Sequence, residues 1–142
     1  MKTDLSKRIP IIAGEWSITG KLLEYISPDQ ENIDLFNPET VSFPRVVIEQ
    51  NGRFFTYDPL DGRLPKLGVF EPIYLDGKLK GWKAYTVDTR TDDEILILNF
   101  TKICKCGKVK EFDITYIESG FSTDSTADQR PRVEYATATR IN

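Results

Sequence analysis

The chain has 142 residues, a formal net charge of −3 and 39% hydrophobic residues, values typical of one globular domain that can bury a core without disulfides or metals. We therefore expect residues 1–142 to form a single domain. Lys and Arg are dispersed along the chain and His is absent, which disfavours nucleic-acid binding, histidine-dependent catalysis and histidine-ligated metal sites.

Residues 12–23 alternate between apolar and polar side chains around Trp16. Ile12, Trp16 and Ile18 fall on one side, and the positions between them are mostly polar. This period of two predicts a first strand with one buried face. A Trp on that face adds a large buried surface, and its indole N–H still requires a hydrogen-bond partner.

The connection over 26–44 contains three prolines and shows no strand periodicity. Ser27, Pro28 and Gln30 have the spacing of a helix N-terminus, so we expect one short helix near 28–36. A connection of this length in a compact domain often covers a cavity mouth or an active site.

Two hairpins are predicted next. In 45–58, Asn51 and Gly52 suit the two positive-φ positions of a type I′ turn, which would place Gln50 opposite Arg53. In 68–88 the turn is expected at 76–77. The pattern of this second hairpin does not decide which of its faces is buried.

The longest predicted strand pair covers 94–104 and 109–119, and Gly107 is available for a left-handed position in the turn between them. Residues 133–141 alternate again and form the last strand. The total is about eight to ten antiparallel strands joined mostly by hairpins, a pattern that calls for a sandwich or a closed barrel. The absence of long crossovers favours an all-β, up-and-down barrel.

Gly14 and Trp16 on the first strand resemble the G-x-W element of the calycins, which include the lipocalins and fatty-acid-binding proteins. Arg140 on the last strand resembles the late Arg or Lys that packs across the first-strand Trp in that group. The resemblance implies a barrel with a small-molecule cavity, closed by a contact of Arg140 with Trp16. A solvated Arg140 at a frayed chain end is the alternative.

Cys104 and Cys106 form a C-x-C at a hairpin end. Two thiols cannot complete a tetrahedral metal site in one chain, and residues two apart in a strand are poorly placed for a disulfide. We therefore expect reduced, structural cysteines.

The inward residues of the predicted strands are either solid core or the lining of a cavity. A cavity would have a mostly apolar wall with a few polar groups from two tyrosines and one arginine. The predicted lining residues are Phe55, Tyr57, Leu98, Phe100, Phe112, Tyr116 and Arg140.

Three interpretations of function follow. The first is a non-enzymatic barrel that binds a small apolar or amphiphilic ligand, and the second is a structural or protein-interaction domain with a solid barrel. The third is a cofactor-independent isomerase or cyclase. We expect no catalytic residue, cofactor or metal. No membrane span or export signal is recognisable, which indicates a cytoplasmic or intracellular protein, and the sequence does not indicate a protein partner or homo-oligomer.

Overall fold

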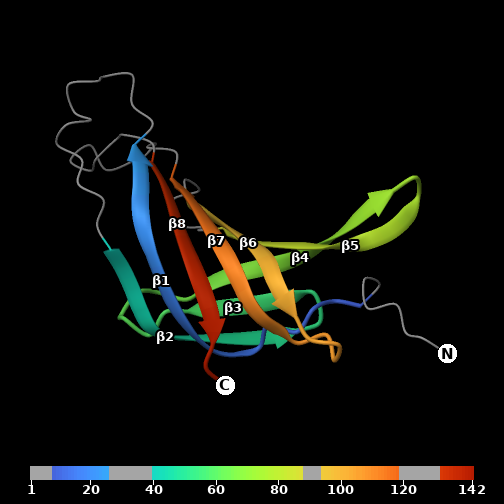
Figure 1. Cartoon of the computed structure of the whole chain (residues 1–142), viewed down its shortest axis with the longest axis horizontal. Coiled ribbons are helices and arrows are strands. Elements are labelled where there is room, and N and C mark those ends of the chain that lie inside the picture. Colours follow the sequence, from blue (N-terminus) through green and yellow to red (C-terminus); the bar gives the residue numbers. More distant parts are fainter. Residues whose placement is uncertain (1–7, 26–39, 88–93, 119–131) are drawn as a thin grey trace.

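The computed structural model describes residues 8–25, 40–87, 94–118 and 132–142, which form eight antiparallel strands (Figure 1). The strands are β1 (Gly14–Tyr25), β2 (Thr40–Asn51), β3 (Phe54–Asp58), β4 (Lys66–Leu75), β5 (Lys78–Val87), β6 (Glu94–Ile103), β7 (Val109–Glu118) and β8 (Arg132–Arg140).

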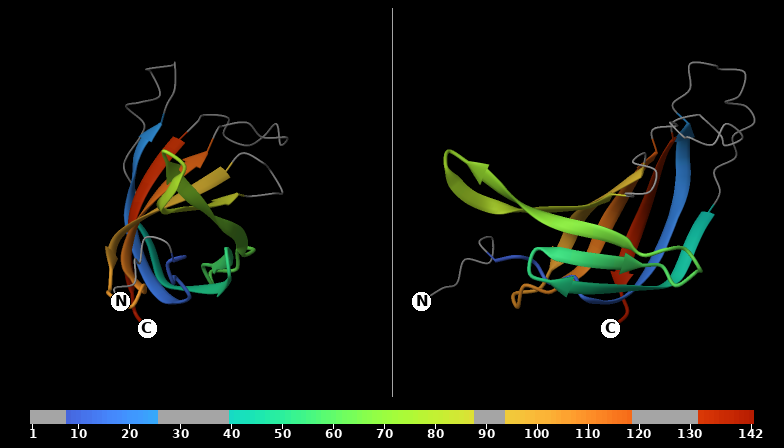
Figure 2. Two further views of the ribbon diagram at one scale, coloured as in Figure 1. Left: turned by 90° about the vertical axis from the view of Figure 1, so that its right-hand side faces the viewer. Right: turned by 180° about the vertical axis from the view of Figure 1, so that it is seen from behind.

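Each strand pairs with its neighbour in sequence, and β8 pairs back with β1 to close the barrel. The prediction of an all-β, up-and-down barrel is confirmed. The predicted helix near 28–36 lies outside the described residues. Strands β1, β3, β5 and β7 finish at one end of the barrel, here named the Lys66 end. The β2–β3 and β6–β7 turns and the end of β8 at Arg140 lie at the opposite end, named the Arg140 end (Figures 1 and 2).

The two short hairpin turns differ from each other. Asp76 and Gly77 both have positive φ values of 51° and 75°, which confirms the predicted turn at 76–77. In the first hairpin only Gly52 is positive, at 60°, and Gln50 lies opposite Phe55 instead of Arg53. The predicted type I′ turn at 51–52 is therefore wrong, because the loop is one residue further along with Gly in its first position. The residue opposite Gln50 is two positions further along than predicted, and side chains two positions apart in a strand share a face. The buried faces are therefore the predicted ones.

Strand β2 begins at Thr40, earlier than the predicted hairpin start at residue 45. Its pairing with β1 slips between Trp16, opposite Val46, and Ile18, opposite Phe43. Pro44 lies in this irregularity, where its missing N–H does not interrupt a regular ladder. The proline that indicated a loop in the sequence is accommodated by a bulge within the strand.

A chain of aromatic rings fills the middle of the barrel. Trp16 contacts Phe112 with ring centroids 4.6 Å apart, and the contacts continue from Phe112 through Phe100 and Phe70 to Phe55 at 5.4 to 6.3 Å. Three of these contacts are edge-to-face, a geometry that aromatic quadrupoles favour, and the Phe70–Phe100 contact is tilted. The rings come from five different strands, so they join opposite walls of the barrel.

The β4–β5 hairpin continues beyond the barrel wall as a two-stranded ribbon (Figures 1 and 2). Pairing with β3 ends at Val69, and pairing of β5 with β6 begins at Ala84. At the base of the ribbon Trp82 packs against the core, whereas Tyr85 faces outward and donates its O–H to Glu71. The face carrying Trp82 and Ala84 is therefore the inner one, which the sequence pattern left undecided.

The N-terminal segment 8–13 crosses the Arg140 end without joining the barrel sheet. Ile12 is fully buried, and the Trp16 indole N–H donates to its carbonyl at 2.9 Å. The side chain of Gln50 accepts from the backbone N–H of Ile12 and Ala13 and donates to the carbonyl of Pro10. These hydrogen bonds satisfy backbone groups of the segment that a neighbouring strand would pair in a sheet.

Ile11 completes this closure by bridging to the β6–β7 turn. Its N–H donates to the Gly107 carbonyl at 3.0 Å, and its carbonyl accepts from the Val109 N–H at 2.9 Å. The segment therefore acts as a backbone plug at the Arg140 end.

Arg140 ties the plug, β8 and β1 together. Its guanidinium carbon lies 4.5 Å from the centroid of the Trp16 ring. The guanidinium also donates to the carbonyls of Val109 at 2.7 Å, Ala13 at 2.6 Å and Ile11 at 3.1 Å. The predicted contact of Arg140 with Trp16 is confirmed, and the alternative of a frayed residue is wrong.

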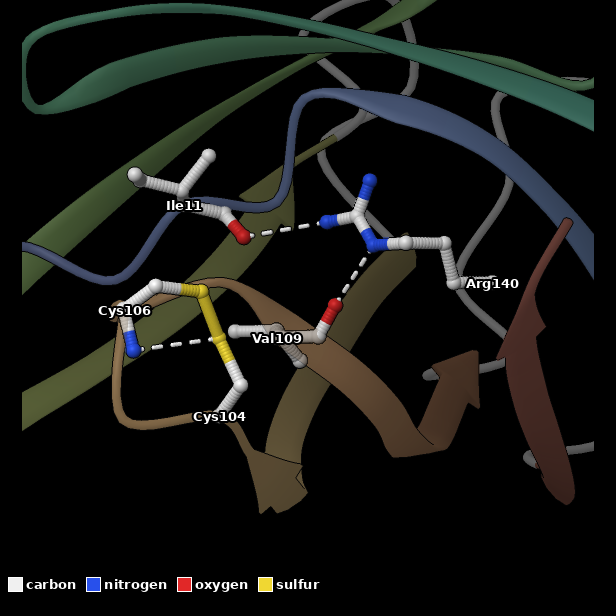
Figure 3. Close-up of a disulfide and its surroundings, with 5 residues drawn as sticks. All are labelled: Ile11, Cys104, Cys106, Val109 and Arg140. Atoms are coloured by element: carbon white, nitrogen blue, oxygen red, sulfur yellow. Dashed lines mark hydrogen bonds between the residues drawn. A yellow bond between two sulfur atoms is a disulfide. The ribbon is translucent and has the colours of Figure 1, made fainter. Parts of the chain in front are cut away.

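Cys104 and Cys106 are joined in a disulfide, so the prediction of reduced cysteines is wrong (Figure 3). That prediction assumed an extended strand, whereas β6 ends at Ile103 and Cys104 opens the turn. The Gly107 N–H donates to the Cys104 carbonyl at 2.9 Å, and the two cysteine Cα atoms lie 5.2 Å apart. This separation is within the ordinary range for a disulfide.

Replacing Arg140 tests whether this clasp closes the barrel. Arg140→Lys keeps the charge but loses the planar stack and most donors, so we expect the free energy of unfolding to fall by about 3 kcal/mol. Trp16→Ala should cost about 3–5 kcal/mol because it leaves a cavity. Urea unfolding measures both. Arg45→Lys is the control, because Arg45 is an exposed partner of Glu15 and its loss should cost under about 1 kcal/mol. An Arg140→Lys protein as stable as the parent would contradict the clasp.

Candidate functional site

Strand register gathers a set of polar side chains inside the Lys66 end. One cross-strand row faces the interior and contains Phe55, Gly68, Thr86, Leu96, Tyr116 and Glu134. Tyr57 and Lys66 are paired one row nearer the barrel end, and Glu94 begins β6 beside them. The two rows place hydroxyl, ammonium and carboxylate groups around an otherwise apolar interior.

Lys66 and Glu94 form an ion pair across the barrel mouth. The Lys66 Nζ lies 2.5 Å from a Glu94 carboxylate oxygen, and the side chains are only 16% and 24% exposed. The same Nζ lies 5.7 Å from the centroid of the Tyr116 ring, within the range of a cation–π contact. Partial burial and good geometry distinguish this pair from the exposed ion pairs of the outer surface.

Thr86 carries the unusual polar atom of this site. The residue is fully buried, and its hydroxyl has no hydrogen-bond partner among the described residues. Gly68 and Leu96, its neighbours in the row, offer no side-chain hydrogen-bonding group. Buried hydroxyl groups are normally paired with protein, water or ligand, so this atom indicates a position where a bound molecule could be recognised.

Tyr57 faces the interior with only 5% of its surface exposed. Burial raises the pKa of its hydroxyl well above the ordinary value. Arg63 in the β3–β4 connection opposes this rise, and Asp61 in the same connection adds to it. Tyr57 therefore remains a neutral group that can donate a hydrogen bond.

The predicted lining residues occupy two different regions. Tyr57 and Tyr116 lie in the polar rows at the Lys66 end. Phe55 lies in the same row as Tyr116, and both Phe55 and Tyr57 are also part of the packed core. Leu98, Phe100 and Phe112 belong to that core or contact it. Arg140 lies at the opposite end and donates to backbone carbonyls, so it does not lie with the tyrosines.

Sequence reasoning missed Lys66, Thr86 and Glu94. Lys66 precedes the predicted start of its strand at residue 68, and Thr86 lies on a hairpin whose inner face the pattern did not decide. One signal was available for Thr86, since it is two residues from Ala84 and must share its face. The pairing of Lys66 with Glu94 joins residues 28 apart in sequence and has no local signal.

No family model matches the chain, and no curated protein or solved structure matches it. The closed eight-stranded antiparallel barrel is compatible with a calycin-like fold. In residues 8–25, 40–87, 94–118 and 132–142 there is no cluster of three or more potential metal ligands. The same ranges contain no helix of a length and hydrophobicity suited to crossing a bilayer.

The raised pKa of Tyr57 predicts a pH dependence of stability. The unfolded tyrosine loses its proton near pH 10.0, whereas the folded residue keeps it, so alkali favours unfolding. Above that pH the free energy of unfolding of the parent should fall by up to about 1.4 kcal/mol per pH unit more than that of Tyr57→Phe. Urea unfolding from about pH 9 to pH 11.5 measures this difference. Tyr74→Phe, at an exposed position, should follow the parent, and an identical slope for parent and Tyr57→Phe would contradict the assignment.

Proposed function

We propose that this barrel binds a small apolar or amphiphilic molecule at its Lys66 end. The observation that carries the proposal is the buried Thr86 hydroxyl, which has no partner among the described residues. A buried hydroxyl left unpaired destabilises the fold by about 1–3 kcal/mol, so a core built only for stability would favour Val at this position. An apolar interior with a few convergent polar groups is typical of small-molecule sites.

The charges at this end favour a ligand with a neutral polar group. Lys66 is already compensated by Glu94 at 2.5 Å. A net anionic ligand would therefore gain little from Lys66. An alcohol or amide can both donate to and accept from the Thr86 hydroxyl, and its apolar part would contact Leu96 and the Tyr116 ring.

The plug closes the Arg140 end of the barrel, which supports ligand entry from the Lys66 end alone. Residues 10–13 are held there by Gln50, Trp16 and Arg140. Opening that route would break several buried hydrogen bonds together. The predicted cover over 26–44 adjoins the Lys66 end in sequence, although 26–39 lies outside the described residues.

The protein-interaction interpretation is a second candidate, favoured by the β4–β5 ribbon. Ile73, Tyr74 and Leu75 near its tip are 43%, 63% and 60% exposed. Residues 71–83 pair only with each other, so both edges of the ribbon carry backbone groups without a strand partner in the described sheet. Such edges can accept a strand from another protein.

Thr86→Val separates the ligand-binding proposal from a purely structural role. Removing an unpaired buried hydroxyl without changing side-chain shape should raise the free energy of unfolding by about 1 kcal/mol. The same change should weaken binding of dodecanol about tenfold, because the ligand loses a hydrogen bond. Isothermal titration calorimetry with dodecanol, dodecanoate and dodecylamine, each below its micelle concentration, measures affinity and head-group preference.

Thr137→Val is the matched control, because Thr137 is exposed on the outer face and bonds Asp113. This variant should bind dodecanol like the parent. A parent protein that binds none of the three probes, or a Thr86→Val protein with unchanged affinity, would contradict the ligand-binding proposal. Loss of binding in a stabilised Thr86→Val protein would support it.

A further inference from the structure

The Cys104–Cys106 disulfide contributes little to holding its turn together. It encloses only three residues, and a loop this short restricts the unfolded chain by about 1.6 kcal/mol in the chain-entropy model. Two backbone hydrogen bonds also close the turn. The Cys104 N–H donates to the Lys108 carbonyl, and the Gly107 N–H donates to the Cys104 carbonyl, both at 2.9 Å. Ile11 anchors the turn from outside through Gly107 and Val109. The turn therefore does not depend on the disulfide alone.

The two sulfur atoms have different surroundings (Figure 3). Cys106 is exposed, whereas Cys104 is half-buried and its sulfur accepts the Cys106 backbone N–H at 3.2 Å. A hydrogen bond to sulfur stabilises the thiolate that forms when the disulfide opens. Cys106 is thus the more exposed residue of the pair, and the hydrogen bond makes the Cys104 sulfur the better leaving group.

Positive charge surrounds this turn. Lys105 lies between the two cysteines in sequence, Lys108 follows them, and Lys102 and Lys110 lie just outside. Lys102, Lys108 and Lys110 line an open hollow of about 500 Å³ beside the turn. Glu111 is the acidic side chain in this lining, and it is paired with Lys102 at 3.4 Å. The cationic surface lowers the free energy of a thiolate and attracts anionic thiols.

We propose that Cys104 and Cys106 form a thiol–disulfide exchange site for anionic thiols such as glutathione. A glutathione thiolate attacks the Cys106 sulfur, so that a bond forms between these two sulfurs, the Cys104–Cys106 bond breaks, and Cys104 leaves as a thiolate. A second glutathione thiolate then attacks the glutathione sulfur of the mixed disulfide and releases the Cys106 thiolate. The protein gains two electrons, two glutathiones become one glutathione disulfide, and the two thiol protons pass to the cysteines or to solvent.

The reaction is tested on the full chain with glutathione buffers. Oxidised protein is equilibrated in a series of glutathione buffers. The square of the reduced glutathione concentration divided by the oxidised glutathione concentration varies about a thousandfold over this series. Free thiols are then alkylated, and mass spectrometry measures the fraction of reduced protein. We expect the protein to pass from mainly oxidised to mainly reduced while its thermal melt stays that of a folded barrel. A disulfide that stays oxidised at every ratio, or that opens only when the chain unfolds, would overturn the proposal.

Two further measurements test the roles of the residues. Peptide mapping of the transient mixed disulfide should find glutathione on Cys106, and finding it on Cys104 would refute the assigned direction. Lys108→Gln should slow reduction by glutathione about threefold and leave reduction by uncharged β-mercaptoethanol unchanged. Lys78→Gln, at the far β4–β5 turn, is the control and should match the parent with both thiols. An equal effect of Lys108→Gln on both reagents would exclude recognition of the anionic thiol.

Discussion

The fold depends on satisfying the backbone of a short irregular segment at one end of the barrel. Every backbone N–H and carbonyl from Pro10 to Ala13 has a hydrogen-bond partner, although the segment belongs to no barrel strand. Buried backbone groups without partners are costly, so the segment can plug the barrel only where Gln50, Trp16, Arg140 and the β6–β7 turn supply donors and acceptors together. One arginine thereby joins the first strand, the last strand and the plug.

This closure gives the two barrel ends different chemistry. At the Arg140 end, the guanidinium of Arg140 donates to backbone carbonyls, and the aromatic chain that begins with Trp16 fills the adjoining interior. At the Lys66 end the interior carries an ion pair, a neutral tyrosine and a threonine hydroxyl without a protein partner in the described residues. A buried hydroxyl without a hydrogen-bond partner is the basis on which we propose a recognition element at this end. The redox-active pair proposed in the turn lies away from that interior.

Alternation along the strands was sufficient to predict the barrel and most of its buried face, because side-chain direction follows a period of two wherever one face is buried. Local exceptions were not predictable. Pro44 indicated a loop but lies at a bulge, and the short loop at Gly52 was misplaced by one residue. The site was only partly predictable, since Tyr57 and Tyr116 follow from the pattern, whereas the pairing of Lys66 with Glu94 depends on barrel closure.

We propose that ligand recognition belongs to the Lys66 end, whereas closure belongs to the Arg140 end. Amide chemical-shift mapping by NMR during titration with dodecanol tests this claim most directly. We expect the largest shifts at Thr86, Leu96 and Tyr116, with little change at Ile12 and Val109. Shifts concentrated around the plug, or along the β4–β5 ribbon with none in the interior, would contradict it.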